Sequence, residues 1–192
     1  DRIVIFSKGE QNKLLFGSFA CDSEIGFLKI KERALSENIE VKPFESIYFQ
    51  KGSFSVLDHD NNHISFGIPV KTEIPQKRFL YSPLQHLTFQ SLDVGKFIDF
   101  YQNKLGFAVS DRVVNKKGLI TTCFLRSNHE HHTLACFKSD KAGVDHHSYE
   151  VGKWNLIRDW CDRFAEFGIK LVWGPGRHGP GNNLFAFIED SD

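Results

Sequence analysis

Histidines stand at recurring places in this 192-residue chain, each beside a short run of β-branched and aromatic residues. His86 lies near the start of a run that ends at Gln90, and His146 opens a similar run that ends at Val151. Side chains alternate across a strand, so imidazoles at matching places can face each other when two such strands approach. Because imidazole nitrogens are common metal ligands, the pair predicts a metal held in a half-open sheet.

A carboxylate beside this pair would complete an iron site. Two imidazoles and one carboxylate on one side of an iron ion leave open positions for a substrate and for oxygen, as in the facial triad of non-haem Fe(II) enzymes. A lone histidine between apolar neighbours is usually structural, but two at matching places favour metal ligation. Glu189 is the nearest carboxylate in the expected region, yet we expect the ligand on the last strand of the second module, which would follow Asp192.

The elements that must position these histidines repeat along the chain. From Leu84 the pattern predicts a strand, a helix capped by Asp93, and three further strands. The same order restarts at His146 and is cut short at Asp192, and the segment before Val70 looks like another partial copy. One such module cannot bury its half-apolar sheet alone, so modules should pair. The predicted fold is α+β, with paired βαβββ modules that form half-open, barrel-like sheets with helices outside.

The hydrophobic pattern also predicts where individual strands and helices begin and which side chains face inward. Residues 2–6 and 46–57 are each predicted to form one strand. Asp22 or Ser23 is expected to cap the first helix, and Trp154 is expected to face inward on the last one.

Composition shifts divide the chain into domains. Residues 71–83 contain Pro75 and Pro83 among polar residues and are predicted to be a linker. We expect residues 1–70 to be a partial N-terminal domain, a degenerate βαβββ module without metal. Residues 84–192 are expected to form the catalytic domain, two βαβββ modules of which the second lacks its last strand.

Composition excludes several classes of partner. The formal net charge is zero and no basic block is present, which argues against nucleic acid and against anionic membranes. No apolar run approaches the roughly 20 residues of a membrane span, so a soluble protein is expected. The four cysteines form no CxxC pair, and we expect free thiols in a reducing, cytoplasmic compartment.

Four short segments together resemble a known family. Residues 84–89, 131–135, 146–151 and 176–178 read LQHLTF, HHTLA, HHSYEV and GRH. They resemble type I extradiol ring-cleavage dioxygenases of the vicinal oxygen chelate superfamily, which also contains glyoxalases and bleomycin resistance proteins. The likeness covers nearly all of the chain from residue 84 onward and, more loosely, residues 13–68.

The resemblance implies a role for each histidine of these segments. It makes His86 and His146 ligands of Fe(II), with Mn(II) as the alternative metal, and it places the third ligand, a glutamate, beyond Asp192. It makes His132 the catalytic acid and base, and it makes His178 a catalytic residue that hydrogen-bonds the substrate or an oxygen intermediate. The implied reaction is extradiol (meta) cleavage of a catechol-type ring by O2, in aromatic hydrocarbon catabolism, by an enzyme expected to be a homo-oligomer.

One departure from the family pattern concerns the substrate. Phe187 occupies a substrate-binding position where the family usually has a tyrosine. The missing hydroxyl removes a hydrogen bond to the substrate and oxygen, so the rate or the substrate range should differ.

Other functions share this fold and stay open at this point. One is a glyoxalase-like or epimerase-like metal enzyme, and another is a non-catalytic module that binds a small molecule. His132 and His178 beside the ligand pair favour the dioxygenase, since the other chemistries usually recruit glutamates. His129 and His131 flank or alternate with His132 and are predicted to face solvent.

Overall fold

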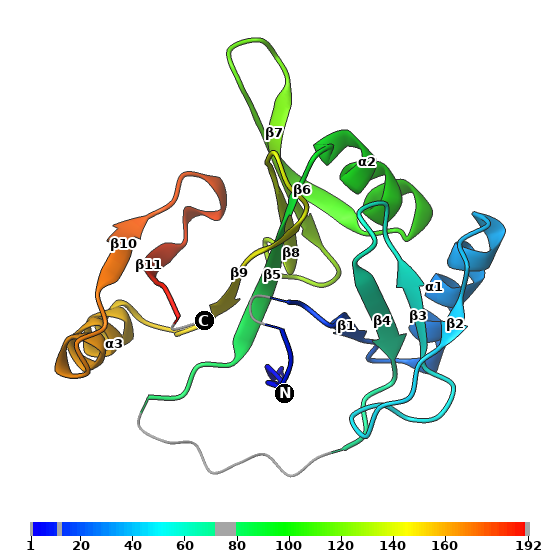
Figure 1. Cartoon of the computed structure of the whole chain (residues 1–192), viewed down its shortest axis with the longest axis horizontal. Helices are drawn as coiled ribbons and strands as arrows, with labels where there is room; N and C mark the ends of the chain where they lie inside the picture. The colour runs from blue at the N-terminus through cyan, green and yellow to red at the C-terminus, as the bar shows by residue number, and fades with distance from the viewer. Residues whose placement is uncertain (1, 11–12, 72–79, 191–192) are drawn as a thin grey trace. The chain divides into compact units, whose positions relative to one another are not determined.

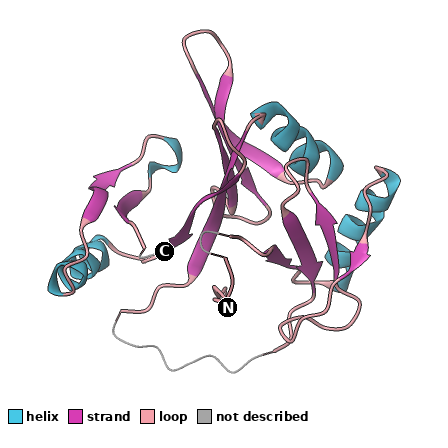
Figure 2. Cartoon of the chain, viewed as in Figure 1, coloured by secondary structure: helices cyan, strands magenta, loops and turns pink. Residues whose placement is uncertain are grey.

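Strands dominate the fold of the chain, as Figures 1 and 2 show. The structure is a computed structural model that describes residues 2–10, 13–71 and 80–190. Two compact units result. The larger comprises Lys13–Glu73 and His86–His146, and the smaller comprises Asp1–Asn12, Ile74–Gln85 and His147–Asp192.

The first βαβββ module forms a four-stranded sheet. The sheet has the order β1-β4-β3-β2, in which β1 and β4 are parallel and the other pairs are antiparallel. Its elements are β1 (Gly17–Ala20), α1 (Glu24–Ser36), β2 (Lys42–Pro43), β3 (Phe54–Leu57) and β4 (His63–Gly67).

The second module repeats this topology in a five-stranded sheet of order β6-β7-β8-β5-β9. Here β5 and β8 are the parallel neighbours, as β1 and β4 are in the first module, and the next module contributes β9 beside β5. The α+β fold and the repeated βαβββ order are therefore confirmed, with open sheets rather than closed barrels. The elements are β5 (Leu84–Ser91), α2 (Val94–Ile98), the π-helical η1 (Asp99–Lys104), β6 (Ala108–Val114), β7 (Ile120–Arg126), β8 (Leu134–Lys138) and β9 (Gly143–Tyr149).

The last described elements belong to the smaller unit. The helix α3 (Trp154–Glu166) packs against the antiparallel strands β10 (Leu171–Arg177) and β11 (Leu184–Ile188), with the 3-10 turn η2 (Pro180–Asn182) between the strands. Gly174 on β10 has a φ of 94°, and a Cβ there would lie 2.8 Å from the carbonyl oxygen of Phe185. Only glycine fits this close approach of the two strands.

The larger unit holds the buried core. Alternate residues of β5, β7 and β8 face it, and each fully buried apolar side chain contributes about 1.5–3 kcal/mol. Because side chains alternate across a strand, the residues between them, His86 included, point to the opposite face of the sheet. The residues that face the core are Leu87, Phe89, Cys123, Leu125, Leu134 and Cys136.

Three predicted boundaries and one predicted side-chain orientation were wrong. Residues 2–6 are not a strand, because a β-branched run needs a partner edge to pair with and no strand pairs with it in the described ranges. The strand predicted over 46–57 begins only at Phe54, after a turn. Strand β9 begins at Gly143, so His146 lies inside the strand rather than at its start. Trp154 is 51% exposed rather than inward, because it is the first residue of its helix.

One predicted helix cap was confirmed, and further features can be compared with the described residues. Ser23 caps α1 by accepting a hydrogen bond from the amide of Gly26 at 3.1 Å. All four cysteines are free, and the pKa of Cys136 is raised by its hydrogen bond with Cys123 and by burial. Within the described ranges, no helix is both long and apolar enough to cross a bilayer. Residues 72–79 of the predicted linker lie outside the described residues, so the domain boundaries stay predictions.

A buried hydrogen bond joins the two modules of the larger unit. The hydroxyl of Tyr101, on η1, donates to Asp58 Oδ2 at 3.0 Å, and Tyr101 is completely buried. Asp58 also accepts hydrogen bonds from the amides of Asp60 and Asn62, which shapes the turn between β3 and β4. Burial, followed by the charge of Asp58, raises the pKa of Tyr101 well above 10, so the hydroxyl remains a donor.

Removing this hydroxyl should destabilise the larger unit. Tyr101→Phe is expected to lower the free energy of unfolding by about 1.5–3 kcal/mol, since a buried carboxylate loses a hydrogen bond. Urea denaturation measures the change. The matched control is Tyr149→Phe, at a tyrosine that is 47% exposed, which should cost less than about 0.5 kcal/mol. Equal stabilities of the two variants would contradict this view of the Asp58–Tyr101 contact.

Asp93, the predicted cap of the second helix, gives a prediction that depends on pH. Asp93 accepts a hydrogen bond from the amide of Lys96 at 3.1 Å, and chiefly this bond lowers the pKa of the Asp93 carboxyl. A lowered folded-state pKa means that the carboxylate stabilises the fold above its unfolded pKa of about 4. That stabilisation is lost as the pH falls through the folded-state value.

We therefore expect Asp93→Ala to lower the free energy of unfolding by about 1 kcal/mol at pH 7. The difference between the variant and the native chain should shrink as the pH falls below about 4. Urea denaturation at a series of pH values measures this, with Asp93→Ser as the variant that keeps a cap. A difference that grows on acidification would show that another interaction is responsible.

Candidate functional site

Three neighbouring strands bring three predicted histidines together in the larger unit. His86 lies on β5, His146 lies on β9 beside it, and His132 lies two residues before the start of β8, on the other side of β5. The amide of Leu87 donates to the carbonyl of Thr133 at 3.3 Å, which places the start of β8 next to His86. The sheet order alone therefore explains why residues up to 60 positions apart meet.

The two predicted ligands converge through the same ring atom. The Nε2 atoms of His86 and His146 are 3.3 Å apart, and their ring centroids are 5.4 Å apart. Two imidazole nitrogens that bind one divalent ion at about 2.1 Å lie roughly 3.0–3.4 Å apart for angles of about 90–110° at the ion. The pair thus has the donor atoms and the separation that a shared divalent metal requires.

A carboxylate orients one of these rings. Asp145 Oδ1 lies 2.5 Å from Nδ1 of His146, so a proton on Nδ1 leaves Nε2 with the lone pair that a metal needs. The sequence prediction missed Asp145, and its only signal was its place directly before the histidine. Among the residues that the structure describes, no group of three or more His, Cys, Asp or Glu side chains is arranged to hold a metal. The third ligand stays a prediction.

His132 is the buried member of the cluster. Its ring centroid is 4.3 Å from that of His86, and the residue is only 7% exposed. The ring of Phe124 on β7 lies 5.0 Å from His132, and Phe137 on β8 lies 6.2 Å from His146. These apolar rings border the histidines and strengthen their hydrogen bonds by keeping the surroundings weakly polar.

His131 does not behave as predicted. Its Nδ1 atom lies 2.9 Å from Nδ1 of His132, and its side chain is only 26% exposed. The prediction that it faces solvent was wrong because strict alternation applies only inside a strand, and both histidines precede β8, which begins at Leu134.

His178 belongs to the smaller unit, where it joins an aromatic cluster of the β10–β11 hairpin. Its ring stacks on Phe185 with centroids 3.8 Å apart and planes at 10°. Trp173 lies 5.1 Å away and Phe187 lies 6.1 Å away. The hairpin thus gathers the residues predicted to contact substrate, and their catalytic roles stay predictions.

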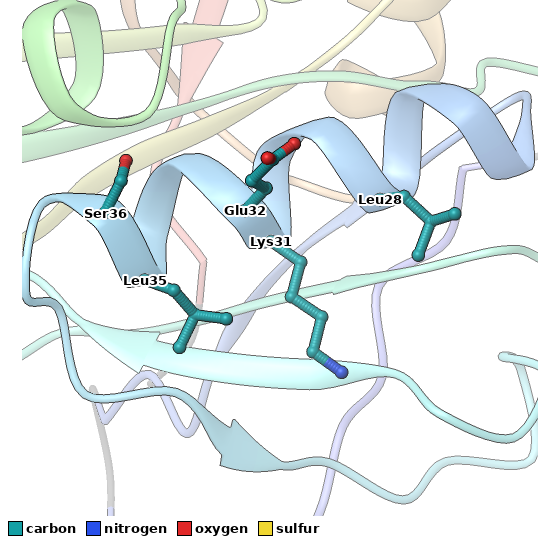
Figure 3. Close-up of a pocket in the computed structure, with 5 residues that line it drawn as sticks. All are labelled: Leu28, Lys31, Glu32, Leu35 and Ser36. Atoms are coloured by element: carbon teal, nitrogen blue, oxygen red, sulfur yellow. The ribbon is translucent and has the colours of Figure 1, made fainter.

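An open hollow lies along α1 (Figure 3). It contains no imidazole and shares no residue with the cluster, so it is not the predicted site. Its lining residues are Leu28, Lys31, Glu32, Leu35 and Ser36.

A comparison of sequences finds a protein that is similar to nearly the whole of this chain. Metapyrocatechase 2 of Cupriavidus necator is 26% identical over 207 residues, which covers 96% of this chain and 63% of that protein. The chain therefore spans less than two thirds of the length of this relative.

Solved structures with the same fold include a protein named as a dioxygenase and one named as a glyoxalase. The 2,3-dioxygenase LapB of Pseudomonas sp. KL28 superposes with a TM-score of 0.79 at 15% identity, over 92% of this chain and 67% of LapB. A Mn(II)-bound glyoxalase of Novosphingobium aromaticivorans superposes with a TM-score of 0.72 at 22% identity, over 89% of this chain and 57% of the glyoxalase. At these identities the likeness shows the fold alone.

The family follows from a sequence profile that matches residues 84–192, more than half of the chain and the part that contains all four predicted site histidines. This chain belongs to the Glyoxalase/Bleomycin resistance protein/Dioxygenase superfamily.

Proposed function

We propose that this protein is an Fe(II)-dependent extradiol dioxygenase that opens a catechol-type ring next to its two hydroxyls. The observation that carries the proposal is the approach of His86 Nε2 to His146 Nε2 at 3.3 Å, with the ring of His132 in contact with His86. The relative named metapyrocatechase supports the same reaction class.

The chain's own residues have distinct tasks in this reaction. His86 and His146 would hold the metal, with Mn(II) as the alternative to Fe(II), and Asp145 keeps the ring of His146 in the ligating tautomer. The bound metal supplies the Lewis-acid and redox chemistry that a diol and O2 need in order to react. His132 takes a proton from the diol as it binds and returns one when the ring opens. Imidazole suits both steps because its ordinary pKa is about 6.5.

The position of His132 favours this reaction over the glyoxalase-like alternative. The ring of His132 is buried and lies beside the ring of His86. From this place it can move a proton without binding the metal itself. A module that only binds a small molecule would need neither the converging ligand pair nor this third ring.

Further parts of the proposal come from the sequence. His178 is proposed to hydrogen-bond the substrate or oxygen, and Phe187 is proposed to border the substrate without the hydroxyl that the family usually has. Assembly of several copies and a cytoplasmic location complete the proposal.

Replacing His132 should separate metal binding from turnover. His132→Ala is expected to retain the metal and to lose about 10²–10⁴-fold in kcat, the usual contribution of a general acid–base. Anaerobic loading with Fe(II) followed by metal analysis gives the first quantity. Absorbance of the yellow ring-opened product from catechol or a 3-substituted catechol gives the second.

The matched control is His129→Ala, because His129 is exposed and close in sequence to His132. The control should keep both the metal and the turnover of the native protein. Full activity of His132→Ala would reject its acid–base role. Absence of any Fe(II)-dependent ring-opened product from the native protein, with metal bound, would reject the dioxygenase itself.

A further inference from the structure

The environment of His132 includes a second histidine whose ring it meets edge on. The planes of His131 and His132 are at 90°, and their Nδ1 atoms are 2.9 Å apart. At this distance one Nδ1 carries a proton and the other accepts it, since two lone pairs would repel each other. The contact therefore fixes the protonation pattern of both rings.

A carboxylate on a neighbouring strand favours one direction of this hydrogen bond. Asp111 Oδ2 lies 3.9 Å from Nε2 of His131, and Asp111 pairs with Phe124 across β6 and β7. A carboxylate attracts a proton on Nε2, and a neutral His131 then has its lone pair on Nδ1. In that tautomer His131 Nδ1 accepts the hydrogen bond and His132 Nδ1 donates it.

The same pattern determines what His132 offers on its other side. With the proton on Nδ1, a neutral His132 has its lone pair on Nε2, the form that can accept a proton. Phe124 supports the arrangement, since its ring contacts both histidines, with centroids 5.6 Å from His131 and 5.0 Å from His132. The two rings are thus restrained by packing as well as by hydrogen bonding.

We propose that His131 is a positioning residue that holds His132 in the Nδ1–H tautomer, with Asp111 setting the polarity of the pair. The value of this tautomer for catalysis rests on the proposed function, because it makes Nε2 of His132 the atom that takes the substrate proton. The tautomer itself is a property of the chain without metal or substrate and is measured separately.

The test is nitrogen NMR of the ¹⁵N-histidine-labelled chain without metal, at a pH well above the ordinary imidazole pKa of about 6.5. A protonated ring nitrogen and an unprotonated one resonate far apart, so the His132 pair of signals reports its tautomer directly. His132→Gln assigns the signals by their loss. The expected result is a protonated Nδ1 and an unprotonated Nε2 in His132, the opposite of the tautomer that a solvated imidazole prefers.

Variants at His131 then test the cause. In His131→Phe the acceptor is lost, and the Nδ1–H form of His132 should change from the dominant to the minor tautomer. In His131→Asn the side-chain oxygen can replace the Nδ1 acceptor, and the native tautomer should be retained. His129→Phe is the control that should leave the His132 signals in place. Dispersed backbone amide signals show that each variant is folded.

Two outcomes would overturn the proposal. One is a native His132 with its proton on Nε2, which needs no variant to observe. The other is an unchanged His132 tautomer in folded His131→Phe. Neither outcome bears on whether the protein cleaves diols, and lack of dioxygenase activity would leave the tautomer measurement intact.

Discussion

The parallel pairing of β5 with β8, with β9 on the other side of β5, is the constraint on which the site depends. The register is set by Leu87 opposite Leu134, both of which face the core. A slip of one residue would exchange the faces of the strand and turn His86 into the apolar core. The packing of the hydrophobic core thus fixes the register of β5, and the register places His86 on the opposite face of the sheet.

The same topology occurs in the first module, where the chemistry is different. Strands β1 and β4 are parallel neighbours as β5 and β8 are, but the side chains that meet there are Ser18 and Ser65, with their Oγ atoms 2.5 Å apart. The βαβββ scaffold therefore does not determine function by itself. What distinguishes the second module is the set of imidazoles on the face of its sheet opposite the core.

Much of this arrangement was predictable from the sequence because its causes are local or periodic. The repeated strand and helix order and the cap at Asp93 follow from short-range patterns, and the same patterns place His86 and His146 on strands. The strand boundaries of 2–6 and 46–57 failed because strand formation requires a partner that sequence spacing does not reveal. The prediction that His131 faces solvent failed for a related reason. The contacts of its ring depend on side-chain directions in a short segment outside any strand.

The central claim is that His86 and His146 share one divalent ion. The most direct measurement is anomalous X-ray diffraction from crystals of the protein grown with Mn(II) or anaerobically with Fe(II). The account predicts one strong anomalous peak within bonding distance of Nε2 of both histidines, which is absent from crystals of the double variant His86→Ala, His146→Ala. A peak elsewhere, or one that survives in the double variant, would contradict it.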